Sequence, residues 1–155
     1  LRHAGLKALN SLRLEKGFRD YGHDVDNTDT LAEVGLGFTC DFSKDFLGKE
    51  ATQRAKGKPL QRRLVQVLCK NPEPLLFHDE LLLRDGLVVG TIRSGSYGHT
   101  LGGGVGLAMV ESQGEAVNKA WLEAGHWELQ IANRRYSASV SLRPLYDPRA
   151  ERVKA

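Results

Sequence analysis

The chain has 155 residues, of which 41% are hydrophobic and 26% charged, and its formal net charge is +3. This composition excludes a disordered chain, which is poor in apolar residues, and the 17 glycines show no collagen-like period of three. No apolar run approaches the roughly 18 residues of a membrane-spanning helix, so we expect no membrane partner. The mild basic excess suits an anionic ligand or an acidic partner.

The start of the chain indicates a piece of a longer protein. The first residues are Leu1 to Ala4, and the only methionine is Met109. Their mixed charges and the lack of a following apolar core also argue against a signal peptide. Cys40 and Cys69 form no Cys-x-x-Cys pair and lie in apolar surroundings. We therefore expect two buried, reduced thiols in a cytoplasmic or, in a eukaryote, mitochondrial-matrix protein.

The first part of the chain predicts helices separated by loops. Apolar residues fall near helical spacing over residues 1–16, and Gly17 is a natural helix stop. Further along we expect, in chain order, a loop over 18–29, a short helix from Thr30, a buried strand over 35–42 and a helix over 46–56.

From Arg62 onward the pattern is typical of short strands. We expect them over 64–68, 81–84, 87–93, 105–110, 127–132 and 134–142. Asp85-Gly86 is the preferred centre of a tight type I′ hairpin, and Asn133 marks a second hairpin. The polar stretch 111–125 predicts a loop or a short helix. Five or six strands at this spacing favour a small antiparallel β-barrel.

Most signatures of chemistry fail. The run Gly102 to Gly106 does not fit G-x-G-x-x-G and indicates a tight turn between strands. The stretch Asp24 to Asp29 lacks the glycine and glutamate of a calcium loop. No two histidines have metal-ligand spacing, so we expect no metal site. We also assign no catalytic residue within this chain.

Several segments do form a recognisable series. They are, in chain order, SLRLEKGFR (11–19), YGHDVD (21–26), LAEVGLGFTCDF (31–42), DFLGKEA (45–51), DGLVVG (85–90) and SGSY (94–97). Together they resemble the C-terminal folate-binding region of the glycine-cleavage T-protein superfamily, in particular its dimethylglycine and sarcosine dehydrogenase branch. The resemblance covers nearly the whole chain.

The resemblance implies a fold and a function. The fold is α+β: residues 1–58 form the end of an α/β folate-binding domain, and residues 59–155 form an antiparallel β-barrel with a basic tail. The parent protein would oxidise an N-methyl amine with FAD bound outside this chain. Tetrahydrofolate would then capture the one-carbon unit as 5,10-methylenetetrahydrofolate. Because the aspartate-bearing part lies outside the chain, we expect the isolated chain to show no turnover and weak folate affinity at most.

Three residues carry over from the family as candidate folate contacts. Arg13 matches an arginine beside the folate, and its planar guanidinium suits a carboxylate or carbonyl; a structural ion pair with Glu15 or a loop aspartate is the alternative. Phe38 matches an aromatic position and could stack on a flat ring, although core packing is the commoner role. Tyr97 lies in the SGSY turn, where packing is again the alternative.

Three other functions remain open. In the first, the parent protein is an aminomethyltransferase of the T-protein type. In the second, it is a non-catalytic regulatory scaffold of the same superfamily. The third is nucleic-acid binding through Arg62, Arg63, Arg134, Arg135 and the tail. No aromatic strand motif accompanies these arginines, so we expect no nucleic-acid partner. The expected partners are folate and the remainder of the parent chain.

Overall fold

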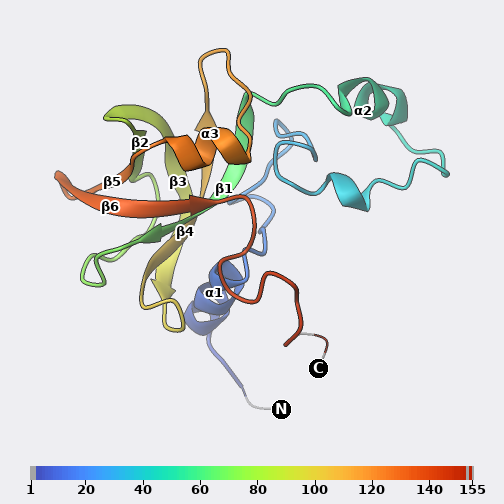
Figure 1. Cartoon of the computed structure of the whole chain (residues 1–155). Helices are drawn as coiled ribbons and strands as arrows, with labels where there is room; N and C mark the ends of the chain where they lie inside the picture. The colour runs from blue at the N-terminus through green and yellow to red at the C-terminus, as the bar shows by residue number, and fades with distance from the viewer. Residues whose placement is uncertain (1–2, 153, 155) are drawn as a thin grey trace.

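The computed structural model describes residues 3–152 and 154. Six antiparallel strands close into a barrel in the order β1-β4-β3-β2-β5-β6, which confirms the predicted barrel. Figure 1 shows this barrel with α1 (Leu6–Glu15) below it and the segment from η1 (Gly37–Thr39) to α2 (Lys49–Ala55) extending to one side as an arm. The strands are β1 (Arg62–Cys69), β2 (Leu81–Arg84), β3 (Leu87–Gly98), β4 (Gly103–Glu111), β5 (Trp127–Ile131) and β6 (Arg134–Ser141).

Of the four helical segments among the described residues, the first and the last pack against barrel strands, and the other two lie on the arm. They are α1 (Leu6–Glu15), the 3-10 turn η1 (Gly37–Thr39), α2 (Lys49–Ala55) and α3 (Lys119–Ala124). The first helix and α2 confirm two of the predicted helices, and α3 is the short helix expected within the polar stretch. The Asn118 side chain caps α3 by accepting a hydrogen bond from the backbone N–H of Trp121 at 2.9 Å. Among the residues that the structure describes, no helix could cross a membrane.

Turn chemistry sets the strand pairing. Asp85 and Gly86 both have positive φ, at 53° and 82°, as a type I′ turn requires. Ala132 and Asn133 form a second such turn, at 47° and 62°. One apolar cluster fills the barrel, and its members include Val65, Val67, Ile92, Leu129, Trp121 and Trp127. A second cluster lies between the barrel and the N-terminal segment and contains Leu14, Val34, Leu64, Val105, Leu107 and Met109.

Two predicted elements are wrong. The segment after Thr30 forms turns rather than a helix, and residues 35–42 form turns and η1 rather than a buried strand. Phe38 in this segment is 84% exposed. The apolar run has no partner strand among the described residues, so no β-ladder can hold it extended. Cys40 is only half-buried, whereas Cys69 is buried as expected, and both are free.

Candidate functional site

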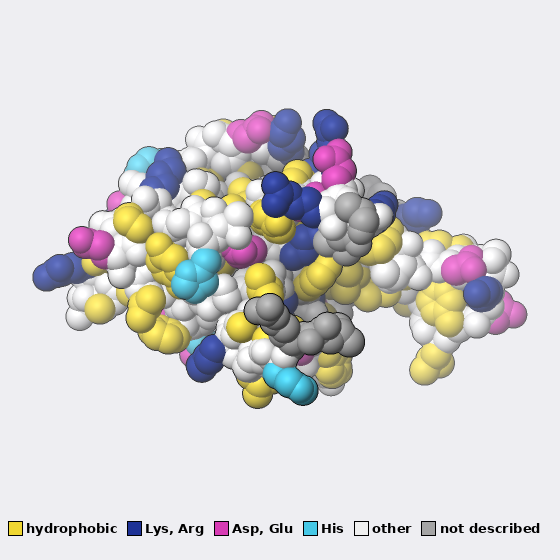
Figure 2. All heavy atoms as spheres, turned by 90° about the horizontal axis from the view of Figure 1, so that it is seen from below, with side chains coloured by type: hydrophobic (Ala, Val, Ile, Leu, Met, Phe, Trp, Pro, Cys, Tyr) yellow, Lys and Arg dark blue, Asp and Glu magenta, His cyan; other side chains and the backbone are white. Residues whose placement is uncertain are grey.

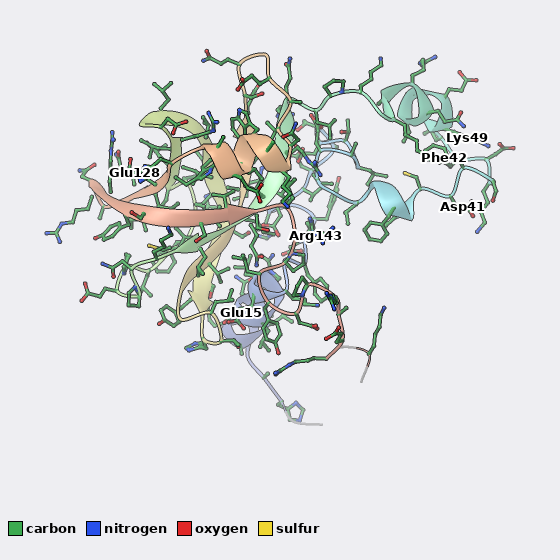
Figure 3. All side chains as sticks on the ribbon, viewed as in Figure 1. Glu15, Asp41, Phe42, Lys49, Glu128 and Arg143 are labelled. Atoms are coloured by element: carbon green, nitrogen blue, oxygen red, sulfur yellow. The ribbon has the colours of Figure 1, made fainter. Side chains whose placement is uncertain are left out.

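The C-terminal half of α1 is fastened to the barrel by its buried side chains. The Ser11 hydroxyl donates to the Tyr97 carbonyl at 2.7 Å. The Glu15 carboxylate accepts the backbone N–H groups of Thr100 and Leu101 at 2.6 and 3.0 Å. Figure 3 shows Glu15 where α1 approaches the strands. The SLRLEKG segment is therefore a docking motif as well as a candidate ligand contact.

A buried glutamine secures the end of α1. Gln66 on β1 donates to the carbonyls of Leu14 and Glu15 at 2.5 and 3.0 Å, in addition to the backbone N–H groups of Gly17 and Tyr146 that these carbonyls accept. Its side-chain oxygen accepts the N–H of Leu145 at 2.6 Å. One side chain thus joins the helix, the barrel and the C-terminal tail.

Arg13 lies on the other side of α1 from Ser11 and Glu15, and it pairs with a loop aspartate. Its Nη1 lies 2.6 Å from Oδ2 of Asp24, which is fully buried, and its Nε donates to Asn10 at 2.7 Å. Asp24 Oδ2 also accepts the backbone N–H of Asp20 at 2.8 Å. The structural pair with a loop aspartate is therefore real. The Nη2 atom of Arg13 donates to none of the residues that the structure describes.

A second buried carboxylate joins the loop to the barrel. Both side-chain oxygens of Asp29 accept from Arg93 on β3, and Arg62 on β1 reaches Asp29 at 3.1 Å. Burial alone would raise the pKa of Asp29, but the hydrogen bonds from Arg93 and the Asp26 N–H and the charges of both arginines outweigh it. The net result is a pKa below the ordinary value. Arg93 also donates to the Asp24 carbonyl at 2.7 Å, which fixes the loop.

A groove of about 640 Å³ runs between α1, this loop and the edge of β3. Its lining residues are Leu6, Lys7, Leu9, Asn10, Arg13, Arg19, Asp20, His23, Phe77, His78, Arg93, Ser94 and Gly95. Figure 2 views the molecule from the α1 side, where apolar side chains lie among lysine, arginine and histidine side chains. The groove therefore combines positive charge with apolar surface.

The cations of the groove are held in place by the backbone. Arg19 donates to the carbonyls of Val34 and Gly17 at 3.0 and 2.6 Å. Burial lowers the pKa of Arg19, and the charge of Asp24 opposes that shift. Leu6, Leu9 and Phe77 supply the apolar part, and each is more than half exposed. Such a site can hold an anion through guanidinium donors and a flat ring against Phe77.

The structure brings together only one of the three predicted ligand contacts. Arg13 lines the groove, whereas Phe38 lies on the projecting arm. Tyr97 lies within β3 rather than in a turn, and its ring packs edge-on against His99 at 5.1 Å between centroids. Neither Phe38 nor Tyr97 is among the groove's described lining residues. Their role in folate binding stays a prediction.

Sequence reasoning missed several groove residues. Phe77 and His78 precede β2 in a loop without a recognisable motif, so only the folded chain shows that they face α1. Arg93 did carry a signal, because a charged residue interrupts the apolar run of β3 at the point where the β3–β4 register shifts. Such a break indicates a side chain directed to a specific partner, here Asp29.

Comparison with known families identifies the chain. A sequence model of the glycine cleavage T-protein C-terminal barrel domain matches residues 62–147. The chain belongs to the glycine cleavage T-protein family. A model of the GCVT N-terminal domain also matches residues 1–44 of this family member.

Relatives in the family are enzymes of two kinds. The chain is 43% identical to 4-methylaminobutanoate oxidase (formaldehyde-forming) of Paenarthrobacter nicotinovorans and 33% identical to mitochondrial sarcosine dehydrogenase of Mus musculus. These alignments cover 99% and 98% of this chain but only 18% and 17% of the relatives' lengths. It is also 33% identical to an aminomethyltransferase of Thermosipho melanesiensis, over 92% of this chain and 37% of that protein.

The fold has a solved counterpart. Aminomethyltransferase T of the glycine cleavage system from Bartonella henselae superimposes with a TM-score of 0.76 at 23% identity. The match covers 93% of this chain and 39% of the other. At this level of identity the similarity shows the shared fold alone.

Proposed function

We propose that the chain is the tetrahydrofolate-binding C-terminal portion of a flavin-dependent N-methylglycine-type dehydrogenase, which captures the one-carbon unit as 5,10-methylenetetrahydrofolate. Two relatives that align over almost the whole chain, the oxidase and the sarcosine dehydrogenase, are named for acting on N-methyl amines. Because the chain spans less than a fifth of either relative, the oxidation step and its FAD belong to the rest of the parent protein.

The observation that carries the proposal is the Nη2 donor of Arg13, which no described residue uses, inside a cationic groove with apolar walls. Folate combines a flat heteroaromatic ring with a carboxylate tail, so it needs both kinds of surface. Arg13 Nη2 offers a donor to a carboxylate or carbonyl, while Asp24 keeps the guanidinium in place. Leu6 and Phe77 offer apolar surface in the same groove. These residues bind and orient the ligand, and we assign none of them to bond making or breaking.

The proposal includes a domain boundary and a location. We place the boundary between residues 58 and 59, because the two family models match on either side of it, over 1–44 and 62–147. A cytoplasmic or mitochondrial-matrix location is supported by the free cysteines and by the mitochondrial sarcosine dehydrogenases among the relatives.

An aminomethyltransferase parent is the second candidate, favoured by the Thermosipho relative, of which the chain covers 37% rather than 17%. A dinucleotide-binding glycine fingerprint upstream in the parent reading frame would decide for the dehydrogenase. A non-catalytic scaffold is the third candidate, and loss of the catalytic aspartate upstream would favour it.

The folate step is tested by titrating tetrahydrofolate into the parent protein and its Arg13→Ala variant. We expect the dissociation constant to rise about tenfold, since one charge-assisted hydrogen bond is lost, while the rate of flavin reduction by the amine stays unchanged. Arg134→Ala, an exposed substitution at the β5–β6 turn, is the matched control. Equal folate affinity in Arg13→Ala would leave Arg13 with its structural role only.

The isolated 155-residue chain provides a second measurement. We expect weak folate binding at most, because the groove is open on the side of α1 where Leu6 is 82% exposed. Tight binding by this chain alone would contradict the assignment of part of the site to the rest of the parent.

A further inference from the structure

A second cavity lies at the barrel mouth beneath α3, away from the groove. The β1–β6 ladder joins Gln66 to Ser141 and continues only toward Cys69, so the start of β1 has no β6 partner. The chain leaves the barrel after β6 at Arg143, and α3 closes the gap from above. The resulting mouth pocket, lined by Arg63, Lys119, Leu122, Glu123 and residues 140–143, has a volume of about 600 Å³. Barrel mouths and volumes of this size are typical of small-molecule sites.

Arg63 places a cation at the rim of the barrel interior. Side chains alternate along β1, so Arg63 shares its side of the strand with Val65 and Val67, which belong to the barrel core. Arg62 lies on the other side and pairs with Asp29 and Glu33. The neighbouring arginines therefore serve different surfaces, and only Arg62 has an acidic partner within the part of the chain that the structure describes.

The guanidinium of Arg63 is incompletely satisfied. Its Nε is buried and has no hydrogen-bond partner among residues 3–152 and 154. Burial lowers the pKa of Arg63. A buried donor without a partner costs stability unless a ligand or water supplies an acceptor. This arginine can therefore donate a hydrogen bond to the oxygen of an anionic ligand.

The rest of the mouth pocket adds a second cation and an apolar wall. Figure 3 shows Arg143 at the bend that follows β6, and within the described residues no carboxylate lies within 4.0 Å of its guanidinium. Lys119 and Glu123 approach each other at 3.5 Å and offset each other's charge. Leu122 is buried and, with Val140 and Leu142, supplies apolar surface. The pocket therefore holds two positive charges that have no acidic partner among the described residues, beside apolar side chains.

We propose that the mouth pocket binds a small organic anion, in which one carboxylate or phosphate group is received by Arg63 and Arg143 and a short apolar chain lies against Leu122. A guanidinium recognises both groups by paired N–H donors. The mouth pocket shares no lining residue with the groove.

The test is an NMR titration of the 155-residue chain with sodium hexanoate, followed through the amide signals of α3, Arg63 and residues 140–143. We expect saturable shifts confined to these residues, and none with hexanamide, which has the same apolar chain without the charge. Butyl phosphate forms the second arm: tighter binding than hexanoate would identify phosphate as the preferred group, and weaker binding would identify carboxylate.

Variants decide whether the arginines carry the binding. Arg63→Gln and Arg143→Gln should each weaken binding of the preferred anion about tenfold, since each removes a charge-assisted hydrogen bond. Arg143 is exposed, so its variant tests the proposal even where Arg63→Gln fails to fold. Arg134→Gln removes the same charge outside the pocket and should leave the affinity unchanged. Equal shifts with hexanamide, unchanged affinity in Arg143→Gln, or no saturable binding of either anion would overturn the proposal.

Discussion

Asp24 is the residue on which the position of Arg13 depends. It is fully buried, and its Oδ2 receives both the Arg13 guanidinium and the backbone N–H of Asp20. Its Oδ1 has no partner among the described residues, so the carboxylate depends on Arg13 for most of its compensation. Removing one member of a buried ion pair is costly because it leaves the other desolvated and unpaired.

We therefore expect Asp24→Asn to lower the free energy of unfolding by about 3 kcal/mol and to weaken folate binding by the parent protein. Chemical denaturation at pH 7 and folate titration measure the two effects. Asp45→Asn is the matched control, because Asp45 is fully exposed and its pair with Lys49 lies at the surface. Equal stability of the two variants would show that the Arg13–Asp24 pair does not fix the loop.

Asp29 gives the stability of the chain a pH dependence. Its folded pKa lies below the ordinary value of about 3.9 because Arg93 and Arg62 outweigh the effect of burial. A group with a depressed folded pKa contributes stability above its unfolded pKa and loses that contribution as the pH falls through the folded value.

The expected result is a difference in stability between wild type and Asp29→Asn that is largest near pH 7 and shrinks below about pH 4. Unfolding free energies at pH 7, 5, 4 and 3 measure it. Asp45→Asn, at a fully exposed side chain, is measured as the control at each pH. A constant difference between wild type and Asp29→Asn at all four values would contradict the assignment.

At the scale of elements, the contact between β3 and the loop that carries Phe77 is close. A Cβ at Gly95 would lie 2.6 Å from the Leu76 carbonyl carbon and 2.7 Å from the Phe77 nitrogen, both backbone atoms. Even one methyl group at this position must move the loop, and the loop forms one wall of the groove.

Gly95→Ala should therefore lower the free energy of unfolding by about 2 kcal/mol, as overpacking does, and shift the Phe77 amide signal. Thermal unfolding and NMR measure the two. Gly37→Ala makes the same chemical change where no atom lies within 4 Å, and it should change neither quantity. A Gly95→Ala chain as stable as wild type would mean that the loop adapts freely.

The barrel was predictable because its signals are local. Alternation marks β6, and Asp85-Gly86 fixes one hairpin through backbone conformation alone. The apolar run over residues 35–42 predicted a buried strand, but a strand also needs a partner, and among the described residues no strand lies beside this segment. Arg13 was found by its motif, whereas Phe77 and Arg93 enter the groove only because strands distant in sequence bring them there.

At the scale of the whole molecule, exposed apolar side chains concentrate in the N-terminal segment. Nine large hydrophobic residues of positions 6–47 are exposed, namely Leu6, Leu9, Leu12, Phe18, Tyr21, Leu31, Phe38, Phe46 and Leu47. Only four others are exposed in the rest of the described chain. We infer that other parts of the parent protein cover some of these side chains, since exposed apolar patches mark contact surfaces.

Leu12→Lys tests whether this side chain is covered in the parent protein. Leu12 is 62% exposed in the 155-residue chain and lies outside the groove. In the 155-residue chain the melting temperature should be unchanged, since the side chain is already in water. In the parent protein we expect a loss of about 2 kcal/mol, because a charge would replace a buried leucine. Leu87→Lys, on the exposed β2–β3 hairpin, should be neutral in both. Unchanged stability of the parent Leu12→Lys would place Leu12 in solvent there too.

The tail after β6 affects ligand binding in the groove through its contacts with α1. Leu145 bonds to Gln66, and Asp147 pairs with Lys16 at the end of α1, so the tail and the groove hold the same helix from different sides. Such linkage is reciprocal: a ligand that immobilises α1 protects the tail from proteolysis by the same free energy that the tail contributes to ligand affinity. Cleavage near residue 144 would therefore weaken binding in a groove that no described tail residue lines.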